Sequence, residues 1–289
     1  MRSLDPSDVF PAGVAGIVTR TIDLRTGIRV RVAESGPADG APFVMLHGWG
    51  ASLYMYHDAL SLLPRQGIRA IAVDLRGYGL SDRPRARGEY SLDHYLDDLD
   101  ALLSSLGYKH VALMGQSMGG GIALHYALRH PARVKSLVLI NPVGLVPIGW
   151  VRVMRLIPRQ LMESLGARMV PRWLTGFILR HLAYGDASLV TEHDVDENWA
   201  PTRIPGFVYA VRAGIAEFDW SPISAEQAAS LTVPTLVVLG TKDRVIIGAR
   251  RAAERLNGVK VVSFEGGHCV HEEHPREVYS AIEKWLGEE

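Results

Sequence analysis

The order of apolar and polar residues along the chain predicts an α/β fold. Segment 28–33 alternates apolar and polar residues, which is typical of a half-exposed strand, and it pairs with segment 19–24 around a turn at 25–27. Six further segments are rich in apolar residues, and continuous apolar runs are typical of parallel strands buried on both faces. They are residues 43–46, 68–73, 111–114, 134–140, 233–240 and 259–264. We therefore expect a mostly parallel, eight-stranded sheet that begins with an antiparallel pair.

Helices are predicted between these strands. Residues 54–63 have a helical pattern, and Ser91 is placed to cap the following helix. In that second helix the apolar residues share one face, the aspartates lie mostly off it, and Gly107 marks its end. The apolar face consists of Leu92, Tyr95, Leu96, Leu99, Leu102, Leu103 and Leu106. Because strands alternate with helices, we expect helices on both faces of the sheet.

The alternation stops after residue 142 and resumes at Val233. Residues 143–225 show helical periodicity without a convincing strand. The first helix of this region carries an apolar stripe opposed by arginines. The stripe consists of Trp150, Val153, Met154, Ile157, Leu161 and Leu165. We therefore expect an α/β core of residues 1–142 and 226–289, with a helical cap, or lid, of residues 143–225 inserted into it.

The clearest candidate for chemistry is the motif Gly115-Gln116-Ser117-Met118-Gly119. It follows a predicted strand and precedes a predicted helix, which is the setting of a nucleophile elbow. The serine of such an elbow lies on a strained turn, where glycines let the strand and the helix approach closely. The N-terminus of the helix then offers unpartnered N–H groups beside the hydroxyl. Ser117 is therefore a candidate nucleophile.

Two polar residues in later loops could complete a catalytic triad. Asp243 follows the strand 233–240, and His268 follows the strand 259–264. Elbow hydrolases carry serine, then an acid, then histidine in chain order. Open α/β sheets place their sites at the carboxyl ends of the strands, which is where both residues are expected. Asp219 and Glu265 are nearby alternatives to Asp243.

Five motifs together resemble the α/β-hydrolase superfamily, and the resemblance covers nearly the whole chain. They are His47-Gly48-Trp49-Gly50, Asp74-Leu75-Arg76-Gly77-Tyr78-Gly79-Leu80-Ser81-Asp82, Gly115-Gln116-Ser117-Met118-Gly119-Gly120, Gly240-Thr241-Lys242-Asp243 and Gly267-His268. The resemblance implies that Ser117 is the nucleophile, His268 the general base and Asp243 the acid that orients it. It also implies an oxyanion hole made by the backbone N–H groups of Trp49 and Met118.

The resemblance implies a serine hydrolase of the esterase or lipase kind. We expect a carboxylesterase that cleaves small to medium, largely apolar esters through an acyl-enzyme. Two other reactions could use the same triad: carbon–carbon cleavage of a β-diketone-like product of aromatic degradation, and perhydrolysis. A third alternative is a non-catalytic ligand receptor on this fold, against which the intact triad and both oxyanion positions argue. Ser117 argues against dehalogenases and epoxide hydrolases, which carry aspartate at the elbow. Asn141 stands where some members carry an acid, and an amide cannot act as an anionic orienter.

The tryptophan and methionine residues of the expected cap could line a largely hydrophobic cleft. The candidates for substrate contacts are Trp150, Trp173 and Met154. His47 is expected to be structural, because it ends a strand and orients the loop that carries Trp49.

The composition limits the partners, the cellular location and the cofactors to be expected for this chemistry. The 31 basic residues balance 31 acidic ones, so there is no basic footprint for nucleic acid. No apolar run is long enough to span a membrane, and the N-terminus lacks an apolar signal region. The single cysteine, Cys269, favours a reducing, cytoplasmic location. No cofactor is implied, and the spacing of His268, His271 and His274 argues against a metal site. The expected partner is a small ester substrate, and the oligomeric state is left open.

Overall fold

The computed structural model describes residues 9–156 and 170–288. Within these residues, eight strands form one sheet in the order β1-β2-β4-β3-β5-β6-β7-β8. The pairs β1–β2 and β2–β4 are antiparallel, and every later pair is parallel. This confirms the expected mostly parallel sheet. The strands are β1 (Ile17–Asp23), β2 (Arg29–Ser35), β3 (Ala41–Leu46), β4 (Ile68–Val73), β5 (Val111–Gln116), β6 (Val134–Ile140), β7 (Thr235–Gly240) and β8 (Val259–Phe264).

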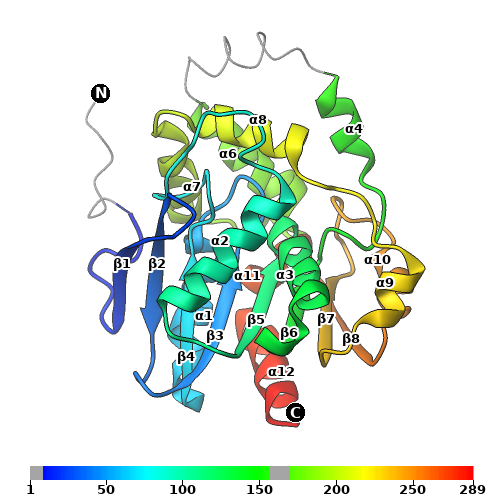
Figure 1. Ribbon diagram of the computed structural model, residues 1–289. Coiled ribbons are helices and arrows are strands. Elements are labelled where there is room, and N and C mark those ends of the chain that lie inside the picture. Colours follow the sequence, from blue (N-terminus) through cyan, green and yellow to red (C-terminus); the bar gives the residue numbers. More distant parts are fainter. Residues whose placement is uncertain (1–8, 157–169, 289) are drawn as a thin grey trace.

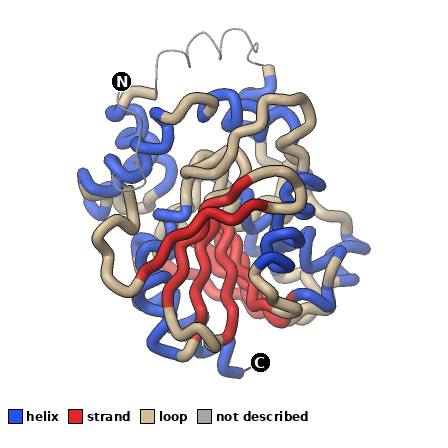
Figure 2. The backbone as a smooth tube through the Cα atoms, turned by 60° about the vertical axis from the view of Figure 1, so that its left-hand side comes forward, coloured by secondary structure: helices blue, strands red, loops and turns tan. Residues whose placement is uncertain are grey.

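Helices cover both faces of the sheet, as Figures 1 and 2 show. One apolar core lies between the sheet and the helices α2 (Leu92–Ser105), α3 (Met118–Arg129) and α10 (Ala249–Ala253). A second core, on the opposite face, involves α1 (His57–Leu62) and α12 (Pro275–Glu288), with α11 (Val270–Glu273) beside them. Short 3₁₀ turns complete this part of the chain: η2 (Leu53–Tyr56), η3 (Leu63–Gln66) and η4 (Pro131–Arg133).

The described residues between β6 and β7 form helices and no strand. Figure 1 shows several of them above one end of the sheet. The division into a core and a cap of residues 143–225 stays a prediction. The elements are α4 (Gly149–Arg155), α6 (Arg172–Ile178), the short π-helix η5 (Leu179–Ala183), η6 (Ala187–Leu189), α7 (Glu192–Trp199), η7 (Ala200–Arg203), α8 (Phe207–Glu217) and α9 (Ala225–Ser230). Among the described residues, no helix is both long and apolar enough to cross a membrane.

The amphipathic helix expected after Ser91 is α2, and its apolar face is buried against the sheet. The helix ends at Ser105, and Gly107 then adopts a φ of 77°, a left-handed conformation that glycine accepts easily. Ser91 occupies the N-cap position but makes no side-chain cap bond to the backbone. Its hydroxyl instead pairs with Nδ1 of His94 at 2.8 Å. The predicted N-cap position is therefore confirmed, but the hydroxyl bonds a nearby imidazole and not the backbone.

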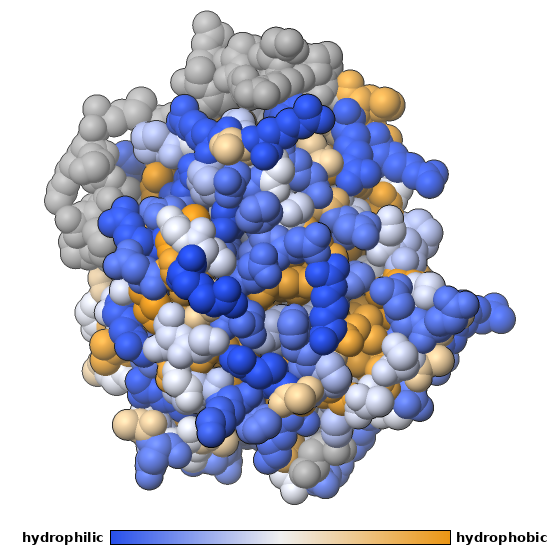
Figure 3. Space-filling view, in the orientation of Figure 1, coloured by the Kyte–Doolittle hydropathy of each residue, from blue (hydrophilic) through white to orange (hydrophobic). Residues whose placement is uncertain are grey.

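Helix α4 contains only the beginning of the apolar stripe expected after residue 149. Trp150 and Met154 are partly buried against the core, but Val153 is 64% exposed, so the stripe does not form one buried face. Leu156, just beyond the helix, is 81% exposed. Figure 3 shows a largely hydrophilic surface with apolar atoms gathered near α4. The remaining stripe positions, Ile157, Leu161 and Leu165, lie outside the described residues.

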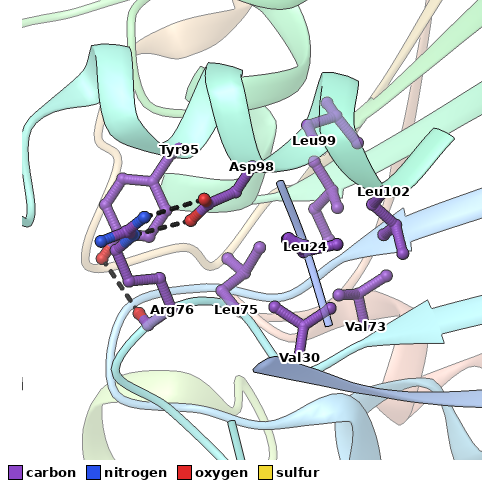
Figure 4. A pocket seen from close by; sticks show the side chains of 10 residues that line it. Leu24, Val30, Val73, Leu75, Arg76, Tyr95, Asp98, Leu99 and Leu102 are labelled. Atoms are coloured by element: carbon purple, nitrogen blue, oxygen red, sulfur yellow. Dashed lines mark hydrogen bonds and ion pairs between the residues drawn. The ribbon is translucent and has the colours of Figure 1, made fainter. Parts of the chain in front are cut away.

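Under α2 lies a cavity of about 20 Å³, lined mostly by leucine and valine. A volume of this size holds roughly one water molecule, so it cannot be a substrate pocket. At its edge the buried guanidinium of Arg76 meets the carboxylate of Asp98 in two hydrogen bonds of 2.6 and 2.8 Å. Figure 4 shows these two side chains facing each other, with Tyr95 beside them. The pair fixes the loop after β4 to α2.

Candidate active site

Ser117 lies on a sharp turn between β5 and α3. Its φ of 52° and ψ of −118° are strained for a residue with a side chain, and the residue is only 7% exposed. The turn is possible because its neighbours are glycines. A methyl group on Gly115 would lie 2.2 Å from the carbonyl oxygen of Gly119, and one on Gly119 would lie 2.1 Å from that of Leu46. The motif therefore has the geometry of a nucleophile elbow.

Asp243 and His268 form a buried pair. Nδ1 of His268 lies 2.8 Å from Oδ2 of Asp243, with side chains 10% and 3% exposed. An ionised carboxylate can only accept, so in the neutral imidazole Nδ1 carries the proton and Nε2 has the lone pair. The other carboxylate oxygen accepts the backbone N–H groups of Val245 at 2.6 Å and Ile246 at 3.0 Å.

These contacts keep Asp243 ionised. Burial alone would raise the pKa of the Asp243 carboxyl, but the hydrogen bond from His268, its charge and the two backbone donors outweigh burial, so the pKa is lowered. The carboxylate beside His268 is thus an anion with fixed orientation. The two alternative acids lie elsewhere: Glu265 pairs with Lys242 on the surface, and Asp219 accepts the N–H of Ser221.

Side-chain amides bring the His268 loop to the elbow. Nε2 of Gln116, the residue before Ser117, donates to the carbonyl oxygen of His268 at 3.0 Å. Nδ2 of Asn141, at the end of β6, donates to the same oxygen at 3.0 Å. Ser117, Asp243 and His268 therefore gather at one end of the sheet, where the strands β5, β7 and β8 finish.

The residues predicted to form the oxyanion hole also lie at this end. Met118 is the first residue of α3, so its N–H has no acceptor within the helix. The loop that carries Trp49 passes directly beside the elbow, since a methyl group on Gly48 would lie 3.2 Å from Cβ of Ser117. The residues Trp49 and Met118 thus both lie in segments next to the serine, and the role of their backbone N–H groups stays a prediction.

His47 holds the loop of Trp49 in place. Its Nε2 accepts the N–H of Leu75 at 3.0 Å, and its Nδ1 contacts the carbonyl oxygen of Gly48 at 2.7 Å. The imidazole is completely buried, and burial lowers its pKa although Asp74 and the Gly48 carbonyl oppose this. His47 therefore stays neutral and acts structurally, as the sequence predicted.

The three residues predicted to contact the substrate differ in their burial and packing. The ring of Trp150 lies 5.5 Å from that of Trp49 and 5.8 Å from that of Trp220, and its indole N–H is buried without a partner among the described residues. Met154 packs against the same apolar core. Trp173 is 70% exposed on α6, so its proposed role in a cleft is not supported. Helical periodicity alone does not tell which side of such a helix faces the core.

Sequence reasoning missed the side chains that hold the His268 loop. These are Gln116, Asn141 and Glu273, all buried. One carboxylate oxygen of Glu273 accepts the N–H of Gly267, and the other accepts those of Gly185 and Asp186 at 2.9 and 3.0 Å. No sequence signal marks such contacts. Among the described residues, no three His, Cys, Asp or Glu side chains are grouped so that they could hold a metal ion.

Known proteins share this fold. The chain belongs to the alpha/beta hydrolase fold family, whose model matches residues 41–193. An AB hydrolase superfamily protein of Bacillus subtilis is 29% identical, over 84% of this chain and 90% of its own length. A meta-cleavage product hydrolase from Pseudomonas fluorescens has a TM-score of 0.79 at 23% identity, over 93% of this chain and 97% of its own. An enol-lactonase from Burkholderia xenovorans has a TM-score of 0.76 at 20% identity, over 93% and 100%.

Proposed function

We propose that this hydrolase is a serine carboxylesterase that cleaves small to medium, largely apolar esters. The observation that carries the proposal is the buried, hydrogen-bonded pair of Asp243 and His268 beside the strained elbow of Ser117. A serine hydroxyl becomes an effective nucleophile only when a base removes its proton, and Nε2 of His268 is the nitrogen free to do so.

The first half of the reaction forms an acyl-enzyme. Oγ of Ser117 attacks the ester carbonyl carbon while its proton passes to Nε2 of His268. The carbonyl oxygen becomes an oxyanion, which accepts hydrogen bonds from the N–H groups of Trp49 and Met118. The bond to the alcohol then breaks, and the imidazolium gives its proton to the leaving oxygen. The acyl group stays on Ser117.

The second half repeats these steps with water. His268 takes a proton from water, the resulting hydroxide attacks the acyl carbon, and the proton returns to Oγ of Ser117 as the acid leaves. In both halves Asp243 remains ionised and stabilises the imidazolium, because the lowered pKa of its carboxyl favours the charged form. No step requires a cofactor.

The substrate class follows from the surroundings of Trp49. The rings of Trp49, Trp150 and Trp220 form a continuous aromatic cluster, which would offer an apolar surface to an acyl or alcohol group. The enol-lactonase with the same fold acts on an ester bond, according to its name, and thereby supports ester cleavage. The cytoplasmic location belongs to the same proposal, because the lone cysteine, Cys269, is buried and free.

A second candidate is hydrolysis of a carbon–carbon bond in a β-diketone-like product of aromatic degradation. We name it because the meta-cleavage product hydrolase has the same fold. It would use the same nucleophile and base.

A substrate screen tests the proposal. The purified protein is assayed with p-nitrophenyl esters of two to twelve acyl carbons and, in parallel, with a vinylogous β-diketone, and Ser117→Ala serves as the inactive control. The proposal predicts Ser117-dependent turnover of esters that exceeds turnover of the diketone. Turnover of the diketone alone would favour the second candidate, and turnover of neither by the folded protein would contradict both.

A further inference from the structure

We propose that Asn141 is a positioning residue for the catalytic histidine, through a side-chain amide that joins the loops of Asp243 and His268. The inference rests on the roles that the proposed function gives to these two residues. Asn141 is 1% exposed and directly follows β6, between the elbow strand β5 and the strand β7 that leads to Asp243.

Every polar group of the Asn141 side chain is used. Nδ2 donates to the carbonyl oxygens of Gly267 at 3.1 Å and His268 at 3.0 Å, and Oδ1 accepts the N–H of Gly240 at 3.0 Å. Carbonyl oxygens can only accept and a backbone N–H can only donate, so the amide has one possible orientation. Neither an acid nor an apolar side chain could make all three bonds.

The backbone of Asn141 is adapted to this task. Its φ of 40° makes it, with Ser117, one of two non-glycine residues with positive φ among the described residues. Asparagine tolerates this region better than most residues do, but the conformation still carries a cost. Strain at a buried residue that bridges two loops suggests a functional constraint rather than a requirement of the sheet alone.

The bridge acts on both members of the Asp–His pair. Gly240 lies three residues before Asp243, and the carbonyl of His268 is fixed by Asn141 and Gln116 together. The two loops are already in close contact, since a methyl group on Gly240 would lie 2.0 Å from the carbonyl oxygen of Gly267. The amide therefore sets the separation of the loops, and with it the 2.8 Å contact between His268 and Asp243.

Asn141→Asp is the sharpest perturbation, because it keeps the size of the side chain and leaves the bond from Gly240 possible. It replaces the amide donor by an oxygen facing two carbonyl oxygens, so the loop of His268 is expected to shift. A misplacement of about 1 Å can cost roughly 100-fold in rate. Asn141→Gly is the second variant, since glycine accepts the positive φ and simply removes the bridge.

Asn257→Asp is the matched control. Nδ2 of Asn257 also donates to a backbone carbonyl oxygen, that of Leu231 at 3.0 Å, but it lies just before β8, at the opposite end of the strand from His268. The same chemical change is thus made at an amide bridge away from the site. Folding of every variant is checked by circular dichroism and thermal unfolding.

The experiment compares kcat, KM, the pH–rate profile and the downfield ¹H NMR resonance of the Nδ1–H of His268. We expect Asn141→Asp and Asn141→Gly to lower kcat by about 100-fold with KM changed less than about threefold. We also expect the resonance to shift or broaden and the acid limb of the profile to move. Asn257→Asp should match the wild type in all four.

Wild-type kcat and an unmoved resonance in both folded Asn141 variants would overturn the inference. If Asn141→Asp does not fold, Asn141→Gly decides by the same criteria. The NMR resonance is recorded without substrate, so it reports the position of the His268 imidazole even if the protein fails to cleave esters. In that case the proposed function fails, while the positioning role is still confirmed or refuted by the resonance.

Discussion

Replacing Asp243 by asparagine should lower kcat by about 10⁴-fold, and the structure explains why an isosteric amide cannot substitute. Oδ1 of Asp243 accepts two backbone N–H groups, and Oδ2 accepts Nδ1–H of His268. An amide has only one oxygen. That oxygen should stay with the two backbone donors, because turning it toward His268 would place the NH₂ group against both N–H groups.

The NH₂ group of the variant would then face His268. Nδ1 would have to accept, so the proton would move to Nε2 and the base could no longer take the proton of Ser117. The comparable change in another triad enzyme costs about 10⁴-fold. This corresponds to about 5 kcal/mol in the activation free energy, of which part is lost stabilisation of the imidazolium.

The assay is hydrolysis of p-nitrophenyl butyrate at pH 7.5, with circular dichroism to check folding. Glu265→Gln is the control, since this carboxylate lies near His268 in sequence but pairs with Lys242 at the surface. The control should keep wild-type kcat. If folded Asp243→Asn retained more than about a tenth of the activity, another carboxylate would have to orient His268, and the reasoning from the two backbone donors would be refuted.

Three further predictions concern stability and specificity. Asp98→Ala should lower the free energy of unfolding by about 3 kcal/mol in urea titrations, because it leaves the buried guanidinium of Arg76 with Glu89 alone of its two carboxylate partners. Asp93→Ala, in an exposed pair, should cost under about 1 kcal/mol. Burial lowers the pKa of the His271 imidazole to about 3, against ~6.5 in the unfolded chain. The protein therefore keeps its full free energy of unfolding above pH ~6.5. It loses up to about 1.4 kcal/mol of this free energy per pH unit as the pH falls from ~6.5 toward 3. His271→Phe should flatten this dependence in thermal unfolding between pH 4 and 7, and an unchanged slope would exclude His271 as its source. Trp150→Ala should change the ratio of kcat/KM between short and long acyl esters by about 10- to 100-fold, whereas the exposed Trp173→Ala should not; equal effects would show that contact with Trp49 does not define the pocket.

Much of the fold follows from local pattern. Segments rich in apolar residues, such as 68–73 and 134–140, became central strands, since strands covered on both faces carry mostly apolar side chains. The order of the strands could not be derived in the same way. The sheet places β4 between β2 and β3, and a periodicity that describes single strands holds no information about their neighbours.

The residues of the candidate site also fall into two groups: those that a local pattern predicts and those that only tertiary contacts reveal. Ser117 could be predicted because its strain requires a local signature of glycines, and Asp243 and His268 because they directly follow strands. In the sequence, Asn141 stood out only because some members of the superfamily carry an acid at this position. Its bonds reach across 99 to 127 residues of sequence, so they exist only once three strands lie side by side. The exposure of Trp173 could not be predicted for a related reason, since the exposed side of a helix is decided by tertiary packing.

The central claim is that Ser117 is a nucleophile activated by His268. A fluorophosphonate tests it most directly, because an activated serine oxygen displaces the fluoride and keeps the phosphonyl group. After brief labelling, the protein is digested and analysed by mass spectrometry, with Ser117→Ala and Asp243→Asn alongside. We predict a single adduct on the peptide that contains Ser117, absent from Ser117→Ala and strongly slowed in Asp243→Asn. A folded wild-type protein without an adduct, or with one that persists in Ser117→Ala, would contradict the claim.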